Sequence, residues 1–188
     1  MANEGLSDSI LVERTRNGDD QSFSALMTRH KSWAYRFVRR YVGNNDDAYD
    51  VLQETFFAAW RAIDRYDTGR PFKFWLRRIA LNKCRDRSRR QALRRLIAID
   101  VEHAPEIGDS APGPYQQAEH DQELSQLEAR IRQLPRSLKE PLMLVALEGL
   151  SQEEAGKLLG VTVKSIETKV YRARLRLAQM CGQERHCL

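Results

Sequence analysis

The chain has 188 residues, of which 41% are hydrophobic and 30% charged, with a formal net charge of +5 and three cysteines. This length suits one ordinary domain or two small ones, and the basic balance points to a polyanionic partner. The longest apolar run, residues 142–147, is too short to span a membrane, the acidic N-terminus is unlike a signal peptide, and the scattered cysteines argue against a disulfide framework, so we expect a protein of the reducing cytoplasm.

Helical periodicity dominates the chain, and no period-2 alternation predicts a strand. We therefore expect an all-α fold. In the first half, cap residues, glycines and one proline divide the pattern into four helices. Their expected ranges are 7–18, 20–42, 46–65 and from 71 to beyond 90.

The third predicted helix has two different faces. One is an apolar stripe of the kind that lies against a core. It consists of Leu52, Phe56, Ala59 and Ile63. The opposite face carries Asp47, Asp50, Gln53, Glu54 and Arg61. Such a polar face is either simply solvated or docks on a basic protein surface, and periodicity does not choose between these interpretations.

The fourth predicted helix follows a short polar loop, 64–71, and separates into two stripes. The core stripe consists of Phe72, Leu76, Ile79, Ala80 and Lys83. The second stripe consists of Trp75, Arg78, Asn82, Arg85 and Arg89. A ring with cations and an amide on one face suits a single DNA strand, because rings stack on bases and guanidinium groups hold phosphates. The alternatives are a tryptophan buried in the core and a solvated helix end, although residues 77–95 hold nine bases and one acid.

Charge divides the chain into three parts. Residues 1–95 have a net charge of +8 and residues 126–188 of +4, whereas residues 96–125 hold seven acids, no lysine or arginine, and five prolines and glycines. Such a segment buries too little apolar surface to offset the entropy lost on ordering. We interpret 96–125 as a flexible acidic linker between two small helical domains, 1–95 and 126–188. The alternative is a long surface loop within one domain.

The second half predicts four more helices, near 122–133, 137–148, 151–159 and 162–180. Ser151 and Glu154 form a capping-box pattern, and Gly160 ends the helix that they start. Ala155 and Gly156 are small where a second helix would cross closely. The buried stripe of the last helix consists of Ile166, Val170, Ala173 and Leu177. Together these features predict a helix-turn-helix; the alternative is a solvated basic helix in another kind of bundle.

The exposed face of the last helix is basic, with five Lys/Arg and one acid in residues 164–176. A recognition helix places its early residues at base edges and its later cations on phosphates. The early residues, behind the cap Thr162, are Lys164, Ser165, Glu167 and Thr168. The later cations are Lys169, Arg172, Arg174 and Arg176, and Tyr171 lies among them on the same face.

Two sets of residues resemble the extracytoplasmic-function (ECF) sigma factors of the sigma-70 family. The residues that resemble region 2 are Asp50-Val51-Leu52-Gln53-Glu54-Thr55-Phe56 and Ala59-Trp60. The resemblance continues in order through Phe72, Trp75-Leu76, Arg78-Ile79-Ala80 and Asn82. Region 4 is resembled by Leu134-Pro135, Gly149-Leu150-Ser151 and Tyr171-Arg172-Ala173-Arg174. The resemblance covers about 20–95 and 126–180 and skips the linker.

The resemblance implies a transcription initiation factor that brings core RNA polymerase, through its β and β′ subunits, to promoter DNA and helps to open it. The residues implied in docking on the β′ clamp helices are Asp47, Asp50, Gln53 and Glu54. The residues implied at the −10 element, with a base pocket near loop 64–71, are Arg65, Lys73, Trp75, Arg78, Asn82, Arg85 and Arg89. The last helix would read the −35 element, and an anti-sigma factor would hold the protein inactive.

Some features leave the interpretation open. The family usually has a basic or small residue where Glu167 stands, so the −35 sequence is not implied. A second hypothesis is a helix-turn-helix regulator that binds duplex DNA without polymerase, which the basic aromatic helix fits poorly. A third, an enzyme, is not favoured, because no phosphate loop, HExxH motif or nucleophile with a base is found. We expect no cofactor and no metal, since Cys181, His186 and Cys187 lack matched ligands elsewhere.

Overall fold

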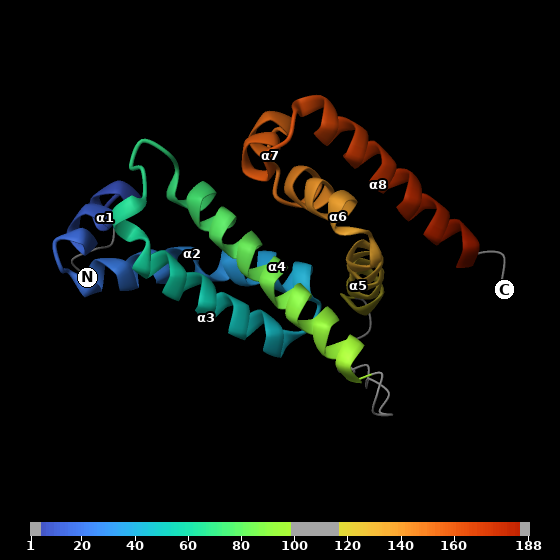
Figure 1. The fold of residues 1–188 in the computed structure, drawn as a ribbon, viewed down its shortest axis with the longest axis horizontal. Helices are drawn as coiled ribbons and strands as arrows, with labels where there is room; N and C mark the ends of the chain where they lie inside the picture. The colour runs from blue at the N-terminus through green and yellow to red at the C-terminus, as the bar shows by residue number, and fades with distance from the viewer. Residues whose placement is uncertain (1–4, 99–116, 185–188) are drawn as a thin grey trace. The chain divides into compact units, whose positions relative to one another are not determined.

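A computed structural model describes residues 5–98 and 117–184, which form helices joined by turns and loops, without a strand among them (Figure 1). The chain divides into two compact units, Met1–Gly108 and Asp109–Leu188. The all-α fold expected from the periodicity is confirmed. In the part of the chain that the structure describes, no helix is long and apolar enough to cross a membrane.

Each unit is built from consecutive helices. The N-terminal unit contains α1 (Asp8–Arg16), α2 (Asp20–Val42), α3 (Asn45–Arg61), the 3-10 turn η1 (Ile63–Arg65) and α4 (Phe72–Ala98). The C-terminal unit contains α5 (Gln117–Gln133), α6 (Arg136–Leu142), the π-helical turn η2 (Met143–Leu147), α7 (Gln152–Leu159) and α8 (Val163–Glu184). The bounds of α2 coincide with the expected range 20–42, and Ser7 caps α1 as expected.

Two expected helices are shorter than the periodicity suggested. The third helix ends at Arg61 and the chain tightens into η1 before the loop. The helix expected at 137–148 is an α-helix only as far as Leu142 and continues as the wider turn η2. Pro141 lies at this change of winding. The winding changes there because proline donates no backbone hydrogen bond and disturbs the turn before it.

The expected linker, 96–125, is helical at both ends. Helix α4 continues to Ala98, and α5 begins at Gln117. Residues 99–116, which include the linker's prolines and glycines, lie outside the described residues. The linker bounds expected from charge therefore differ from the helix ends, because charge composition does not fix where a helix stops.

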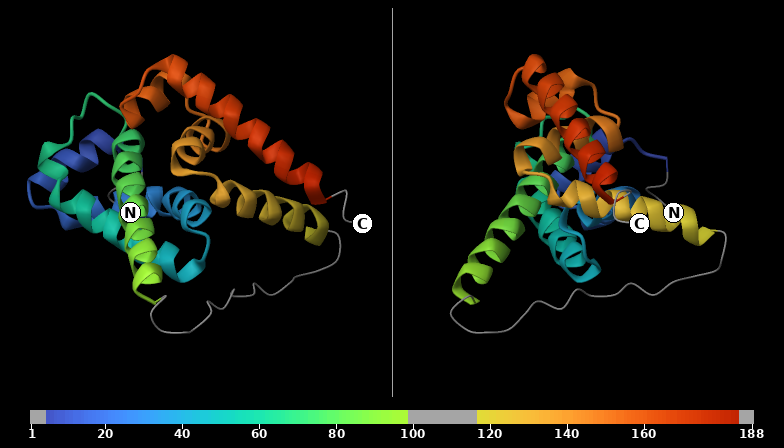
Figure 2. Two further views of the ribbon diagram at one scale, coloured as in Figure 1. Left: turned by 45° about the vertical axis from the view of Figure 1, so that its right-hand side comes forward. Right: turned by 90° about the vertical axis from the view of Figure 1, so that its right-hand side faces the viewer.

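The N-terminal unit is a helical bundle in which α2, α3 and α4 pack against one another and α1 packs against α2 (Figure 2). Side chains from every one of these helices are buried in it. They include Leu11, Leu26, Phe37, Phe56, Phe72 and Leu76. Each such side chain contributes roughly 1.5–3 kcal/mol through its removal from water. The bundle thus fixes the orientation of α4, and with it the outward face of that helix.

The C-terminal unit contains the expected helix-turn-helix. Ser151 and Glu154 form the capping box at the start of α7, and Gly160 ends α7 with a positive φ of 70°. On α8, Ile166 and Ala173 are fully buried, which confirms the core stripe. A Cβ added at Gly156 would lie 2.8 Å from the carbonyl oxygen of Val161, so the turn passes too close for a side chain.

We predict that Gly156→Ala destabilises the C-terminal unit by about 1–3 kcal/mol, because the added methyl group would overpack the turn. Hydrogen exchange of the α7 and α8 amides in the full chain measures this change. The control is Ala178→Ser, which adds one atom at an exposed position of α8 and should stay within about 0.5 kcal/mol of the wild type. Equal protection in all three proteins would contradict the prediction.

Candidate nucleic-acid interface

Helix α4 separates a buried face from an exposed one, but the buried face differs from the predicted core stripe. Ile79 and Lys83 are only half-buried. The buried face also includes Arg77, Leu81 and Cys84, which belonged to neither stripe. Phe72, Leu76 and Ala80 are buried in the bundle. On the opposite face Arg78, Asn82 and Arg89 are exposed, and Arg85 is half-buried. The Asn82 side-chain oxygen accepts a hydrogen bond from Arg85 at 3.3 Å, and Arg89 pairs with Asp86 at 2.5 Å. The structure therefore brings four of the expected strand-contacting residues onto one face.

Trp75 is neither wholly core nor wholly surface. Its ring is half-buried and packs against the core cluster. The ring centroid lies 5.1 Å from that of Tyr66 and 5.4 Å from that of Phe72. Trp75 is therefore partly packed in the core and partly exposed, so the alternative of a wholly buried core tryptophan does not hold.

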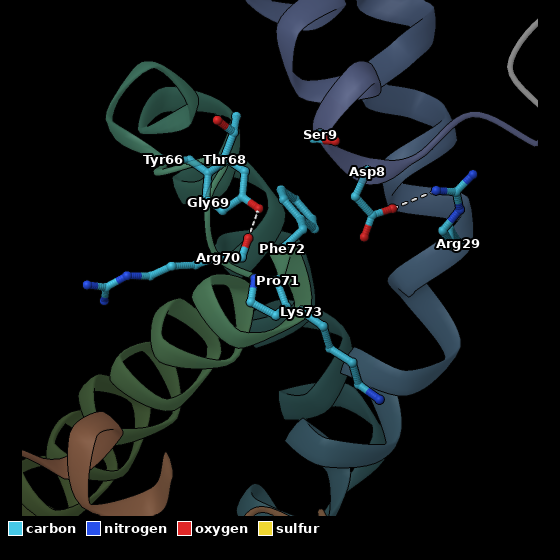
Figure 3. Close-up of a pocket in the computed structure, with 10 residues that line it drawn as sticks. All are labelled: Asp8, Ser9, Arg29, Tyr66, Thr68, Gly69, Arg70, Pro71, Phe72 and Lys73. Atoms are coloured by element: carbon cyan, nitrogen blue, oxygen red, sulfur yellow. Dashed lines mark hydrogen bonds and ion pairs between the residues drawn. The ribbon is translucent and has the colours of Figure 1, made fainter. Parts of the chain in front are cut away.

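A pocket of about 610 Å³ lies beside the loop that joins η1 to α4 (Figure 3). Its lining includes Asp8, Arg29, Tyr66, Arg70, Phe72 and Lys73. Figure 3 shows the Asp8–Arg29 ion pair on one side and the loop, closed by the hydrogen bond of Tyr66 to Arg70, on the other. The pocket thus combines aromatic rings with basic side chains, which are the groups that hold bases and phosphates of single strands.

Of the expected basic residues on η1 and at the start of α4, Lys73 lines this pocket and Arg65 does not. Lys73 is exposed, and its ammonium nitrogen lies 5.0 Å from the ring centroid of Trp33. Arg65 is exposed on η1. Trp33 also receives the guanidinium of Arg77 at 4.9 Å, a cation–π contact that sequence reasoning did not find, because it joins helices distant in the chain.

Asp47 is not on the exposed face where it was expected. It is buried, with a side chain 9% exposed, and its carboxylate accepts hydrogen bonds from Arg87, Gln91 and Asn44. Burial by itself would raise the pKa of Asp47, but the hydrogen bonds from Arg87, Asn44 and Gln91 outweigh it and hold the pKa below its ordinary value. Asp47 therefore joins α3 to α4 and presents no free acidic surface.

The other expected docking residues remain at the surface. Asp50 is 59% exposed and lies 3.5 Å from Arg87. Gln53 is exposed. Glu54 is half-buried and pairs with Arg90 at 3.1 Å and with Lys83 at 3.7 Å. The acids of α3 and the cations of α4 both recur at spacings of three and four residues, and this matched pattern is the sequence signal that could have revealed the pairing.

Exposed aromatic residues on α3 were also missed. Phe57 is 63% exposed and Tyr49 is 52% exposed, although α3 is otherwise a well-packed helix. Tyr49 lies four residues before Gln53 and Phe57 four residues after it, so the three share one helix face. Large rings in water are a feature of protein–protein contact surfaces.

Helix α8 presents its expected DNA-reading residues to solvent. The exposed ones are Thr162, Lys164, Glu167, Thr168, Tyr171, Arg172 and Arg174, while Ser165 and Lys169 are half-buried. The Thr162 hydroxyl accepts a hydrogen bond from the Ser165 amide at 3.2 Å, so it caps the helix. The arrangement matches a recognition helix, with polar side chains near its start and cations further along.

The described residues contain no group of metal-ligating side chains. Cys84 is buried, and Cys181 accepts a hydrogen bond from Arg130 at 3.2 Å. His186 and Cys187, the other two residues of the tail considered as ligands, lie outside the described residues.

We predict that Asp47→Asn lowers the free energy of unfolding of the N-terminal unit by about 3 kcal/mol near neutral pH, because it leaves the partly buried Arg87 charge without its carboxylate. The carboxylate's contribution is fully present above the ordinary carboxyl pKa of about 3.9 and is lost as the pH falls through the lowered pKa of the folded state. The difference between wild type and variant should therefore shrink at acid pH in urea unfolding.

Asp50→Asn is the matched control, because it removes a carboxylate from the same guanidinium at an exposed position. Its effect should stay below about 1 kcal/mol. A pH-independent difference for Asp47→Asn, or equal effects of the two substitutions, would contradict the assignment of a buried ion pair.

Comparison with known families matches both units. The Sigma-70 region 2 model matches residues 26–94, and the Sigma-70 region 4 model matches residues 124–177. The first range contains α3 and most of α4, and the second contains the helix-turn-helix.

Relatives match over nearly the whole chain. The RNA polymerase sigma factor CnrH of Cupriavidus metallidurans is 35% identical over 179 residues, 93% of this chain and 94% of CnrH. The ECF RNA polymerase sigma-E factor of Escherichia coli is 34% identical over 180 residues, 91% of this chain and 92% of that one. The solved structure of CnrH with the cytosolic domain of CnrY matches with a TM-score of 0.68 and 30% identity, over 95% of this chain and 99% of that chain. On this evidence the chain belongs to the ECF sigma factors of the sigma-70 family.

Proposed function

We propose that the chain acts as the promoter-recognition subunit of RNA polymerase, in which the N-terminal unit holds one strand of the melted −10 element and the C-terminal unit reads the −35 element as duplex. The observation that carries this proposal is the division of α4 into a buried stripe and an exposed basic stripe beside an aromatic pocket. This surface suits a single strand better than a duplex, because the face of a base becomes open to an aromatic ring when the base leaves the duplex stack.

The energies of strand capture fit this division of labour. Extruding a base costs a few kcal/mol in lost stacking and pairing. Stacking on an aromatic side chain returns about 1–3 kcal/mol per base, and phosphate contacts add to it. In the proposal one base enters the pocket beside the loop, and the strand then follows the cations of α4. The residues assigned to this path are Arg65, Lys73, Trp75, Arg78, Asn82, Arg85 and Arg89.

Docking on core polymerase is assigned to the exposed face of α3. Asp50, Gln53 and Glu54 supply its polar groups, and the exposed rings of Tyr49 and Phe57 supply apolar area. Asp47 is no longer assigned a direct contact, since its carboxylate is committed to Arg87. Holding both units on one polymerase raises the effective concentration of each DNA site, so two sites of low affinity together bind the promoter with high affinity.

The decisive experiment adds the full chain to Escherichia coli core RNA polymerase and sequences run-off transcripts from genomic fragments of the source organism. Start sites that share two spaced elements, and that need the added chain, are expected. A helix-turn-helix regulator that works on duplex alone would instead bind a palindrome stably without polymerase and yield no transcripts.

Trp75→Ala should lower the formation of open complexes by about 1–3 kcal/mol, which is the worth of stacking one base, and should leave closed complexes nearly unchanged. Permanganate reactivity of −10 thymines measures opening, and mobility shift on ice measures closed binding. Because Trp75 also packs in the bundle, Trp75→Phe is the control, and it should keep most of the opening activity. Equal losses of open and closed complexes in Trp75→Ala would assign the ring to the core alone.

Arg172→Ala should weaken duplex binding and make the plot of log affinity against log salt less steep by about one unit, because one phosphate contact is lost. The control is Arg136→Ala, which removes an exposed cation from α6 of the same unit. A slope equal to that of the wild type would remove Arg172 from the phosphate contacts.

An anti-sigma factor is the proposed regulator. The support is the relative CnrH, whose solved structure holds the cytosolic domain of a second protein. The proposal places the chain in the cytoplasm, where polymerase and promoters lie. Co-expression with the protein encoded by the neighbouring gene should abolish the run-off transcripts described above if that protein is the inhibitor.

A further inference from the structure

Arg16, the last residue of α1, binds the backbone that leads into the pocket loop. Its Nε and Nη2 donate to the Ile63 carbonyl oxygen at 3.1 and 2.9 Å, and Nη2 also donates to the carbonyl of Asp64 at 3.2 Å and to that of Tyr66. The Ile63 carbonyl also accepts the hydrogen bond of the 3-10 turn from the Tyr66 amide at 3.2 Å, so Arg16 uses the second acceptor site of that oxygen. One guanidinium therefore holds three successive points of the chain in place.

The chain held by Arg16 continues directly into the pocket. Tyr66, whose carbonyl Arg16 binds, is buried, and its hydroxyl donates to the carbonyl of Arg70 at the other end of the loop. Between these anchors the loop residues are exposed and are tied by local bonds, such as the Gly69 amide to the Asp67 carboxylate at 3.0 Å. The position of the loop therefore depends on its anchored ends, of which Arg16 holds one.

Helix α1 is itself firmly attached, so it can act as a brace. Leu11 and Val12 are fully buried in the bundle. Asp8 pairs with Arg29 of α2 at 2.6 Å and contacts His30 at 2.8 Å. Arg16 thus ties a loop about 50 residues later in the chain to a helix that is held in place by the bundle.

We infer that Arg16 is a positioning residue for strand capture: it holds loop 66–71 in the conformation that forms the pocket, and it acts through the loop rather than by touching DNA. The residue lies outside residues 26–94, the part that matches Sigma-70 region 2. The inference rests on the proposed function of the pocket. It extends the strand-binding machinery to α1, which the sequence motifs did not include.

The test uses full-length chain in holoenzyme at a promoter found by the run-off experiment. Arg16→Met removes the donors and should lower permanganate reactivity of the −10 thymines at least about tenfold, because a site loosened by a fraction of an ångström loses its geometry. Arg16→Lys should fall between, since one ammonium reaches fewer carbonyls than a planar guanidinium does. Binding to core polymerase should not change.

The matched control is Val12→Ala, which weakens the packing of α1 without removing a bond to the loop. Val12→Ala should open the promoter like the wild type, even if its free energy of unfolding is equal to or lower than that of Arg16→Met. Amide NMR spectra supply a second readout: the signals of residues 67–70 should move in Arg16→Met and stay in Val12→Ala.

The outcomes separate this inference from the proposed function. Wild-type opening by Arg16→Met, or an equal loss in Val12→Ala, would overturn the positioning role while the proposed function stands. A wild-type chain that opens no promoter would overturn the proposed function. The loop signals in the NMR spectra would then decide alone whether Arg16 sets the loop.

Discussion

The burial of one stripe of α4 governs the rest of the N-terminal unit. Phe72, Leu76 and Ala80 are removed from water against α2 and α3. A helix has only one rotation about its axis that buries such a stripe, so burial also fixes which residues point outward. Arg78 and Asn82 are exposed for this reason, and no separate interaction is needed to aim them. The apolar packing supplies the stability, and the polar face of α4 stays at the surface of the unit.

The cations of α4 fall into two sets with different physical roles. Lys83, Arg87 and Arg90 are drawn to the acids of α3. The pairs of Glu54 with Lys83 and Arg90 are partly exposed and contribute little to stability, because water screens them. The pair of Arg87 with buried Asp47 differs, because removing either partner leaves a charge of low exposure without its main counter-ion. The second set, Arg78, Arg85 and Arg89, lies on the outward face of α4, and the proposed function assigns it to phosphates.

The C-terminal unit shows how little tertiary information a helix-turn-helix requires. The capping box of Ser151 and Glu154 and the left-handed turn at Gly160 are local features. Gly156 lets the turn pass within the reach of a side chain, and the buried stripe of α8 completes the packing. Because these determinants lie within about 30 residues of sequence, the motif could be predicted from the sequence. The winding change after Pro141 could not, as it depends on how the helix is held.

By itself the sequence determined the helical class, the bounds of α2, the outward stripe of α4 and the helix-turn-helix, because each follows from periodicity and cap residues close together in the chain. Only the tertiary structure decided that Asp47 is buried against Arg87 and that Trp75 is shared between core and surface. It also decided that Arg16 holds the carbonyls of Ile63, Asp64 and Tyr66. These outcomes depend on contacts between residues 40 or more positions apart in the first and last cases. A local pattern carries no information on which distant group will fill a given space, and packing settles that choice.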